Sequence, residues 1–206
     1  GSWRSSRRRA FSGFTSRHHA GLSRRPGGGT LKPLLARGVA PHFVVALDYH
    51  PISQRFYEGI DPALLADTEL VIDSKVNPLV PSIFPGRIRV IPSASLDRIL
   101  GRAHDAHPLP SVGTVAHLAY CLARHLGCDP VAFIGQDLGF TDGLYYAPGN
   151  AIHEIWAPEL GDFNTIETME WERIVRHRGI LSTLEDVHGR RIHTDVQMLS
   201  YLRTFE

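Results

Sequence analysis

The sequence predicts an α/β domain with an open, mostly parallel sheet and helices on both faces of that sheet. Four short apolar runs are the first observation, at 42–47, 69–72, 88–91 and 131–134. These runs are continuous rather than alternating, which is typical of strands buried on both faces of a parallel sheet. Segments with helical periodicity separate the runs, and this alternation of strand and helix is the second observation.

The helices are predicted in order along the chain. A short one covers 31–36, and the clearest covers 112–126, where apolar residues recur at the spacing of one helical face before Gly127. Two more are predicted at 165–177 and 195–205, with a loop rich in charged residues and glycine between them.

Charge is divided unevenly along the 206 residues. The chain has 22 Lys and Arg and 21 Asp and Glu, a formal net charge of +1. Nine basic residues and no acidic one precede Asp48, which leaves 13 basic and 21 acidic residues, a net −8, from there onward. Residues 1–29, rich in Arg, Ser and Gly, are set apart from a domain at 30–206. We interpret them as a disordered basic tail or as the product of a reading-frame slip, in preference to a nucleic-acid-binding arm.

Composition excludes several classes of protein. The 43% hydrophobic content supports a folded core, but no run approaches the ~20 apolar residues of a membrane helix. Two cysteines, Cys121 and Cys128, cannot form a disulfide scaffold and fit a reducing compartment. The start of the chain has no apolar signal segment. We therefore expect a cytoplasmic protein without a membrane partner.

The strongest local motif opens the helix predicted at 112–126. Ser111 is expected to cap that helix, and Gly113 leaves room for a ligand to approach the backbone. Free N–H groups and the helix dipole then form a site suited to phosphate, to which the Thr114 hydroxyl adds a donor. An ordinary helix cap would explain the same residues. Neither Gly-rich nucleotide signature, Gly-x-x-x-x-Gly-Lys-Ser/Thr or Gly-x-Gly-x-x-Gly, occurs in the chain.

Acidic residues follow the predicted strands, at the edge where open parallel sheets bind ligands. Asp48 closes the first run, and Asp137 follows the last one after Gly135 and Gln136. A carboxylate at such a position can meet a ribose, a metal ion or an acceptor hydroxyl, although a turn Asp would give the same pattern.

The segment beyond the last predicted strand is a long loop with two adjacent tyrosines. Tyr145 and Tyr146 are candidates to stack on a base or sugar, or to pack within the loop. His153 and His193 are candidate acid/base groups because histidine titrates near neutral pH. Asp195 is expected to cap the last helix or to reach the site.

Histidine and cysteine recur along one side of the helix predicted at 112–126. The four residues are His117, Cys121, His125 and Cys128. Eleven residues at a rise of ~1.5 Å spread them over ~16 Å, so four ligands cannot converge on one ion. Their side lies opposite the apolar face, so we expect exposed side chains and predict no metal site.

Two segments, Val112–Ala116 and Leu126–Leu138, form an extended motif that is recognisable as a unit. It resembles the central motif of the motility accessory factor family, to which the archaeal 6-hydroxymethylpterin diphosphokinase-like (MptE-like) proteins also belong. Phe43–Asp48 resembles the family's preceding strand, and Thr141–Gly149 resembles its Tyr-Ala-x-Gly loop. The resemblance implies a Rossmann-like domain, akin to bacterial sialyltransferases, that binds a nucleotide or nucleotide-sugar.

The resemblance implies a nucleotide-dependent transferase. Motility accessory factors are implicated in glycosylating flagellin with nonulosonic acids, so the leading expectation is a nucleotide-sugar glycosyltransferase with a protein acceptor such as flagellin. The alternative is transfer of diphosphate from ATP to a pterin, which would require Mg²⁺; no other cofactor is predicted. Gly113 and Thr114 would bind phosphate, Asp48 and Asp137 would bind ribose or position the acceptor, and a His or Asp would act as base.

One departure from the family concerns the start of the domain. The family normally begins with a strand and a Gly-x-Gly-Pro-Ser turn that helps to hold the nucleotide. Residues 1–29 occupy that position and contain no such turn, so we expect either an incomplete nucleotide pocket or the loss of the first strand. This departure favours a third class of function, a non-catalytic nucleotide-binding or assembly module.

Overall fold

The computed structural model describes residues 30–91, 99, 101, 109, 113–134, 136, 138–146, 151–176 and 179–205. These residues fall into two compact units, the first ending at Phe133 and the second beginning at Ile134. Among them, no helix is long and apolar enough to cross a membrane.

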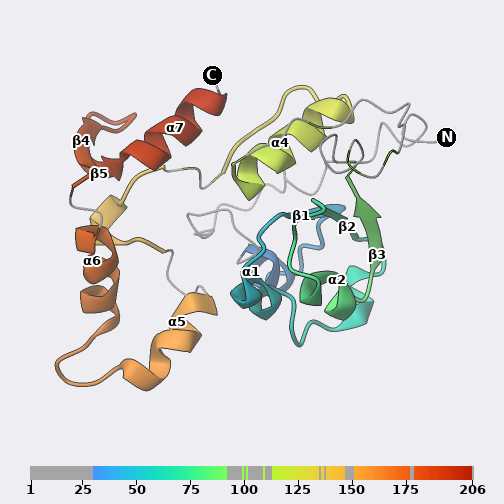
Figure 1. Cartoon of the computed structure of the whole chain (residues 1–206), viewed down its shortest axis with the longest axis horizontal. Helices are drawn as coiled ribbons and strands as arrows, with labels where there is room; N and C mark the ends of the chain where they lie inside the picture. The colour runs from blue at the N-terminus through green and yellow to red at the C-terminus, as the bar shows by residue number, and fades with distance from the viewer. Residues whose placement is uncertain are drawn as a thin grey trace. The chain divides into compact units, whose positions relative to one another are not determined.

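The first unit contains an open, three-stranded parallel sheet (Figure 1). Its strands are β1 (Phe43–Ala46), β2 (Glu69–Ile72) and β3 (Arg87–Val90), in the order β1-β2-β3. The register pairs Phe43 with Glu69 and Glu69 with Arg87. The predicted α/β class is confirmed, and three of the four predicted strands lie within one residue of their expected positions.

Alternate residues of β1 and β2 point into two separate cores. Ala46 and Ile72 belong to one cluster, and Val45 and Val71 belong to the other. Because successive strand residues face opposite sides of a sheet, both faces are covered. The predicted helices on both faces are therefore confirmed.

Different helices cover the two faces, as Figure 1 shows. The Ala46 side packs against the short helices of the unit: α1 (Leu31–Leu35), η3 (Pro51–Phe56), η4 (Pro62–Leu65) and α2 (Leu79–Ile83). The Val45 side packs against α4 (Val115–His125), through the stripe of Leu118, Leu122 and Leu126. Helix α4 thus places the apolar face predicted from its periodicity on the sheet.

The prediction of a fourth strand is wrong, because residues 131–134 have no regular secondary structure. Phe133 and Ile134 are 47% and 52% exposed. The ring of Phe133 packs against Tyr120 of α4, with centroids 5.4 Å apart. Four apolar residues indicate burial but carry no information about a pairing partner, and here a side-chain contact takes the place of a strand ladder.

The described residues of the second unit form three helices and a β-hairpin. The helices are α5 (Ala151–Trp156), α6 (Ile166–Arg176) and α7 (Val196–Phe205), with short 3-10 turns η5 (Thr141–Gly143) and η6 (Ala157–Glu159). The helices predicted at 165–177 and 195–205 are confirmed as α6 and α7.

The loop predicted between those two helices is wrong. Strands β4 (Leu181–Glu185) and β5 (Arg191–Asp195) form an antiparallel hairpin there. Asp186 closes the turn by accepting hydrogen bonds from the backbone N–H groups of His188 and Arg190, and Gly189 has a φ of +74°. The charged side chains that suggested a loop are exposed on the hairpin, where they do not oppose strand pairing.

Candidate functional site

The candidate site lies where β1 and β2 end, at residues 47–50 and 73–77, here called the carboxyl edge. Two hydrogen bonds join these segments: the N–H of Asn77 donates to the carbonyl of Asp48 (2.9 Å), and its Nδ2 donates to the carbonyl of Tyr49 (3.0 Å). The edge is therefore a fixed arrangement of two loops.

Asp48 follows β1, as predicted. Its Oδ1 accepts a hydrogen bond from the N–H of His50 (2.9 Å), and no donor among the described residues reaches Oδ2. Burial raises the pKa of the Tyr57 hydroxyl above its ordinary value, and the negative charge of Asp48 raises it further. The Asp48 carboxylate thus keeps one oxygen for a ligand or a cation.

Asp73 and Lys75 follow β2 and were not singled out from the sequence. Asp73 Oδ1 accepts from the N–H of Lys75 (3.0 Å), whereas its Oδ2 lies 4.0 Å from Lys75 Nζ. That separation is the outer limit of an ion pair, and the Lys75 side chain is 47% exposed, so the ammonium can turn to an anion. The sequence could have drawn attention to Lys75, because the chain has 20 arginines but only two lysines, Lys32 and Lys75.

The first turn of α4 supplies hydrogen-bond donors. The N-cap is Thr114 rather than Ser111, because the helix begins at Val115 and Thr114 Oγ1 accepts from the N–H of His117 (3.1 Å). The predicted cap residue Ser111 lies outside the described residues. Helix geometry gives the N–H groups of Val115 and Ala116 no intrahelical acceptor, and the Thr114 hydroxyl can still donate its hydrogen.

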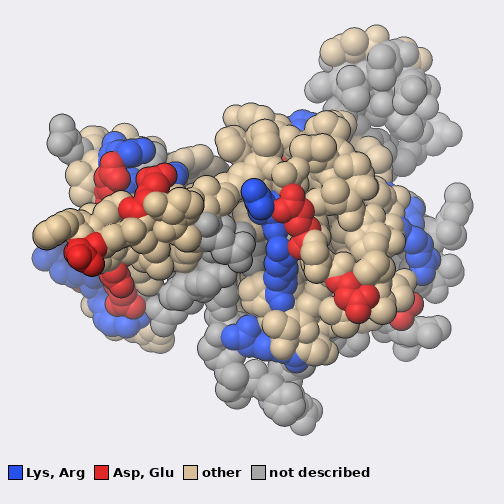
Figure 2. All heavy atoms as spheres, turned by 90° about the horizontal axis from the view of Figure 1, so that it is seen from below, with Lys and Arg blue, Asp and Glu red and all other residues tan. Residues whose placement is uncertain are grey.

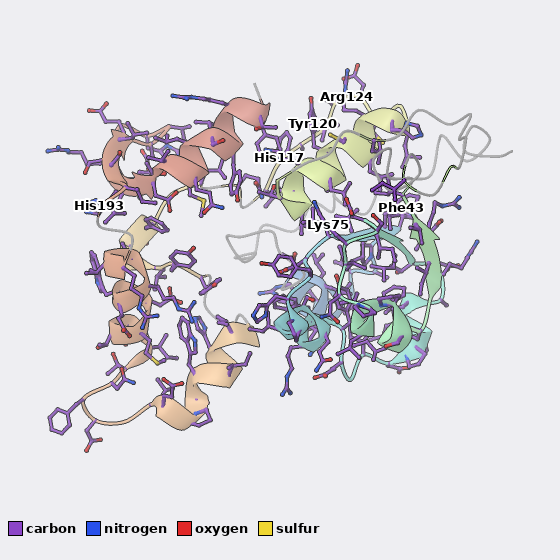
Figure 3. The ribbon with its side chains drawn as sticks, viewed as in Figure 1. Phe43, Lys75, His117, Tyr120, Arg124 and His193 are labelled. Atoms are coloured by element: carbon purple, nitrogen blue, oxygen red, sulfur yellow. The ribbon has the colours of Figure 1, made fainter. Side chains whose placement is uncertain are left out.

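The first turn of α4 and the carboxyl edge lie at the same end of the first unit. Figure 3 shows Lys75 and His117 toward one end of α4, and Phe43 and Arg124 toward the other. Phe43 begins β1, whereas Lys75 follows the end of β2. Helix α4 therefore runs antiparallel to the strands, and its positive end faces the region beyond Asp48 and Lys75.

His117 is buried, which corrects the expectation of an exposed polar side. It is 2% exposed, between the buried residues Ala116 and Leu118. The buried arc of α4 is wider than the apolar stripe, so a position flanking the stripe is covered as well. His125 is exposed, and partial burial raises the pKa of both cysteine thiols. Within the described ranges, no three or more His, Cys, Asp or Glu residues are grouped as metal ligands.

A second cluster, in the second unit, centres on the carboxylate of Glu170 in α6. Glu170 is fully buried, and His153 Nε2 lies 2.7 Å from its Oε1. Oε2 accepts hydrogen bonds from the N–H groups of Tyr145 and Tyr146. The predicted residues His153, Tyr145 and Tyr146 are thus brought together by a residue that sequence reasoning missed. The sequence could have indicated burial of Glu170, because it lies on the same face of α6 as the apolar Ile174, four residues further along.

Aromatic rings surround this Glu170 cluster. Tyr145 stacks on Phe140 with centroids 5.3 Å apart, and Tyr146 meets Trp156 edge-on at 5.9 Å. His153 also lies against Trp156, at 5.4 Å. Packing within the loop, the second interpretation of the two tyrosines, accounts for these contacts.

The remaining predicted residues are not part of the Glu170 cluster. His193 is exposed on β5, with its Nδ1 3.5 Å from Thr183 Oγ1. Asp195 is 1% exposed and caps α7, since its Oδ1 accepts from the N–H of Met198 (2.7 Å). Gln136 is half-buried, and Gly135 and Asp137 lie outside the described residues.

Comparison with known proteins gives a family match. A family model described as 6-hydroxymethylpterin diphosphokinase MptE-like matches residues 27–143, more than half of the chain. No curated protein and no solved structure matches the chain significantly. The matched range includes the carboxyl edge and the start of α4, and it ends before His153 and Glu170.

Proposed function

The chain belongs to the 6-hydroxymethylpterin diphosphokinase MptE-like family, and on that premise we propose that it is a nucleotide-dependent transferase that moves diphosphate from ATP to an acceptor hydroxyl. The observation that carries the proposal is the carboxyl edge, where Lys75, Asp48 and the start of α4 lie within the matched range. Open parallel sheets bind their ligands at this edge.

The phosphate groups of the nucleotide are assigned to three kinds of donor. The Lys75 ammonium supplies a point charge, the N–H groups of the first turn of α4 supply aligned dipoles, and the Thr114 hydroxyl supplies a further hydrogen bond. Gly113 precedes the cap without a side chain, so phosphate can approach the backbone. Asp137 keeps its predicted role, which is to bind ribose or to position the acceptor.

A magnesium ion fits the two carboxylates of the edge. Mg²⁺ binds through one or two protein carboxylates together with substrate phosphates, and Asp48 Oδ2 has no donor among the described residues. Asp48 and Asp73 would hold it. When bound, the ion supplies charge neutralisation at the phosphate oxygens.

The reaction is a displacement at phosphorus. The acceptor hydroxyl oxygen forms a bond to the β-phosphorus of ATP, the bond from that phosphorus to the α,β-bridging oxygen breaks, and AMP leaves with the electron pair. Lys75 and the N–H groups of α4 stabilise the charge on the leaving phosphate. The hydroxyl proton passes to a base.

Binding and turnover test the proposal together. Lys75→Met should weaken ATP binding about 10- to 100-fold, since hydrogen bonds to charged groups contribute about 1.5–3 kcal/mol. Lys32→Met is the matched control, because this lysine, in α1, donates to the carbonyl of Arg55 in η3. Equal loss in both variants would contradict the assignment of Lys75.

Product analysis separates the activities. ATP with hydroxymethyl-dihydropterin should give AMP and the pterin diphosphate. Turnover of a CMP-sugar with a flagellin acceptor, and none with ATP, would instead establish the glycosyltransferase expected from the sequence. Nucleotide binding without turnover of either pair would identify a binding module.

Chemical labelling locates the ligand without a mutation. Bound ATP should protect Lys75 from an amine-reactive acylating reagent and leave Lys32 reactive, measured by peptide mass spectrometry. Because the chain has two lysines, the labelling of Lys75 and of Lys32 can be compared within one sample. Equal labelling of Lys75 with and without saturating ATP would place the nucleotide elsewhere.

A further inference from the structure

Tyr49 stands at the carboxyl edge with a largely exposed ring. We propose that this ring is the platform on which the planar nitrogen heterocycle of the ligand stacks, an inference that rests on the proposed function. Tyr49 is 75% exposed, although it directly follows Asp48 just beyond a strand whose last two residues are buried. Its position assigns the heterocycle to the β1 side of the site, whereas Lys75 and α4 take the phosphates.

The backbone that carries the Tyr49 ring is held from both sides. Asn77 Nδ2 donates to the Tyr49 carbonyl, and the same side chain accepts from the N–H of Leu79 through Oδ1, both at 3.0 Å. On the other side, Asp48 Oδ1 accepts from the N–H of His50.

The residues after Tyr49 are fixed as well. His50 Nδ1 accepts from the N–H of Ile52 and caps η3, whose first residue is Pro51. Only the two side-chain torsions of Tyr49 remain to be ordered when a ligand binds. A tyrosine on a preordered backbone therefore gives contact area at a small entropic cost.

A singly exposed aromatic residue is common on protein surfaces and by itself indicates nothing. Phe163 in the second unit is such a residue, being 98% exposed in the turn before α6. Tyr49 differs in its place: it adjoins the Asp48 carboxylate and its carbonyl is bonded to the loop of Lys75. A stacking ring there completes a site that otherwise has donors and carboxylates only.

The test compares ligands with and without a heterocycle. Isothermal titration should show that the wild-type chain binds ATP more tightly than inorganic triphosphate. Tyr49→Ala should weaken ATP binding about 5- to 50-fold, within the range measured for stacking of a base on an aromatic ring, and leave triphosphate binding within about twofold. Tyr49→Phe should retain the preference for ATP, and Phe163→Ala is the matched control. Because the ring is exposed, thermal unfolding should be unchanged in Tyr49→Ala.

Each outcome separates this inference from the proposed function. Equal binding of ATP and triphosphate by the wild-type chain, or an unchanged ATP preference in Tyr49→Ala, overturns the stacking role and leaves the phosphate site intact. Binding of hydroxymethyl-dihydropterin that depends on Tyr49, without binding of ATP, upholds the platform and rejects the nucleotide. Binding of none of the three ligands rejects both.

Discussion

Glu170 shows how one buried carboxylate can organise a large part of a small unit. It is fully buried and bonded to the ring of His153 in α5 and to two backbone N–H groups of the preceding loop. A buried carboxylate that loses its charge weakens every one of these charge-assisted bonds. The cluster therefore depends on a single side chain.

We expect Glu170→Gln to destabilise the protein by about 1–3 kcal/mol, because the uncharged amide leaves buried donors poorly satisfied. Chemical denaturation measures the change. The control is Glu172→Gln, two residues along the same helix, where the exposed carboxylate pairs with Arg176 and the effect should stay within about 0.5 kcal/mol. Equal effects of the two substitutions would show that burial of Glu170 carries no special cost.

The Tyr57 hydroxyl is expected to make the free energy of unfolding depend on pH at alkaline pH. Burial and the Asp48 charge raise the pKa of its hydroxyl above the ordinary ~10, so the folded state holds this proton when the unfolded state has released it. The contribution is fully present below pH ~10 and is lost as the pH rises through the folded-state pKa. Denaturation midpoints should therefore fall more steeply above pH ~10 in the wild type than in Tyr57→Phe. Tyr49→Phe, at an exposed ring, should follow the wild type; identical slopes in all three would contradict the role of Tyr57.

At the start of helix α4, one residue, Thr114, has a structural role and is also proposed to bind the ligand. Thr114 caps the helix through Oγ1, and the same hydroxyl is assigned to phosphate. The two roles respond differently to charge, because a carboxylate is a good N-cap but repels an anion.

We therefore expect Thr114→Asp to keep the thermal stability of the protein within about 0.5 kcal/mol of wild type. Thr114→Val should lose about 1 kcal/mol. ATP binding should fall at least tenfold in Thr114→Asp, because like charges would meet at the first turn. Thr114→Ser should match the wild type in both measurements. If Thr114→Asp retained its ATP affinity, Thr114 would have a capping role and no role in binding phosphate.

The elements that the sequence predicted are those whose burial follows from their own residues. Val45 and Val71 sit in continuous apolar runs, and Leu118 and Leu122 sit in a regular stripe, so strands and helix could be located locally. The run at 131–134 was equally apolar but formed no ladder, because pairing depends on a neighbour that the run does not encode. The hairpin at 181–195 was missed because its exposed charges resemble a loop.

The candidate site was predictable only in part, for a related reason. Asp48 and Thr114 adjoin recognisable elements, so strand-end and helix-start rules located them. The roles proposed for Tyr49 and Lys75 depend on the hydrogen bonds that join their two loops, and Glu170 meets His153 because α6 brings it there. Such roles arise from tertiary contacts, which spacing along one chain does not report.

At the scale of the molecule, the net charge of +1 describes neither part of the chain. The residues from Asp48 onward carry −8, and Figure 2 shows basic side chains beside acidic ones across the face that it presents. The phosphate recognition that we propose for the carboxyl edge therefore rests on local donors rather than on overall attraction. Residues 1–29 carry seven arginines and no acid, a composition that attracts polyanions through its charge alone.

The salt dependence of affinity distinguishes binding at the carboxyl edge from binding to the Arg-rich residues 1–29. Diffuse attraction to an Arg-rich segment releases counterions and weakens steeply with salt, whereas a site with fixed donors is screened much less. We expect ATP affinity of the full chain to fall no more than about threefold between 50 and 300 mM salt, and oligonucleotide affinity to fall by about a hundredfold or more. Lys75→Met should remove the salt-tolerant ATP binding and leave the oligonucleotide binding unaltered. An ATP affinity that collapses with salt to the same extent in wild type and Lys75→Met would mean that arginine charge, and not the carboxyl edge, holds the nucleotide.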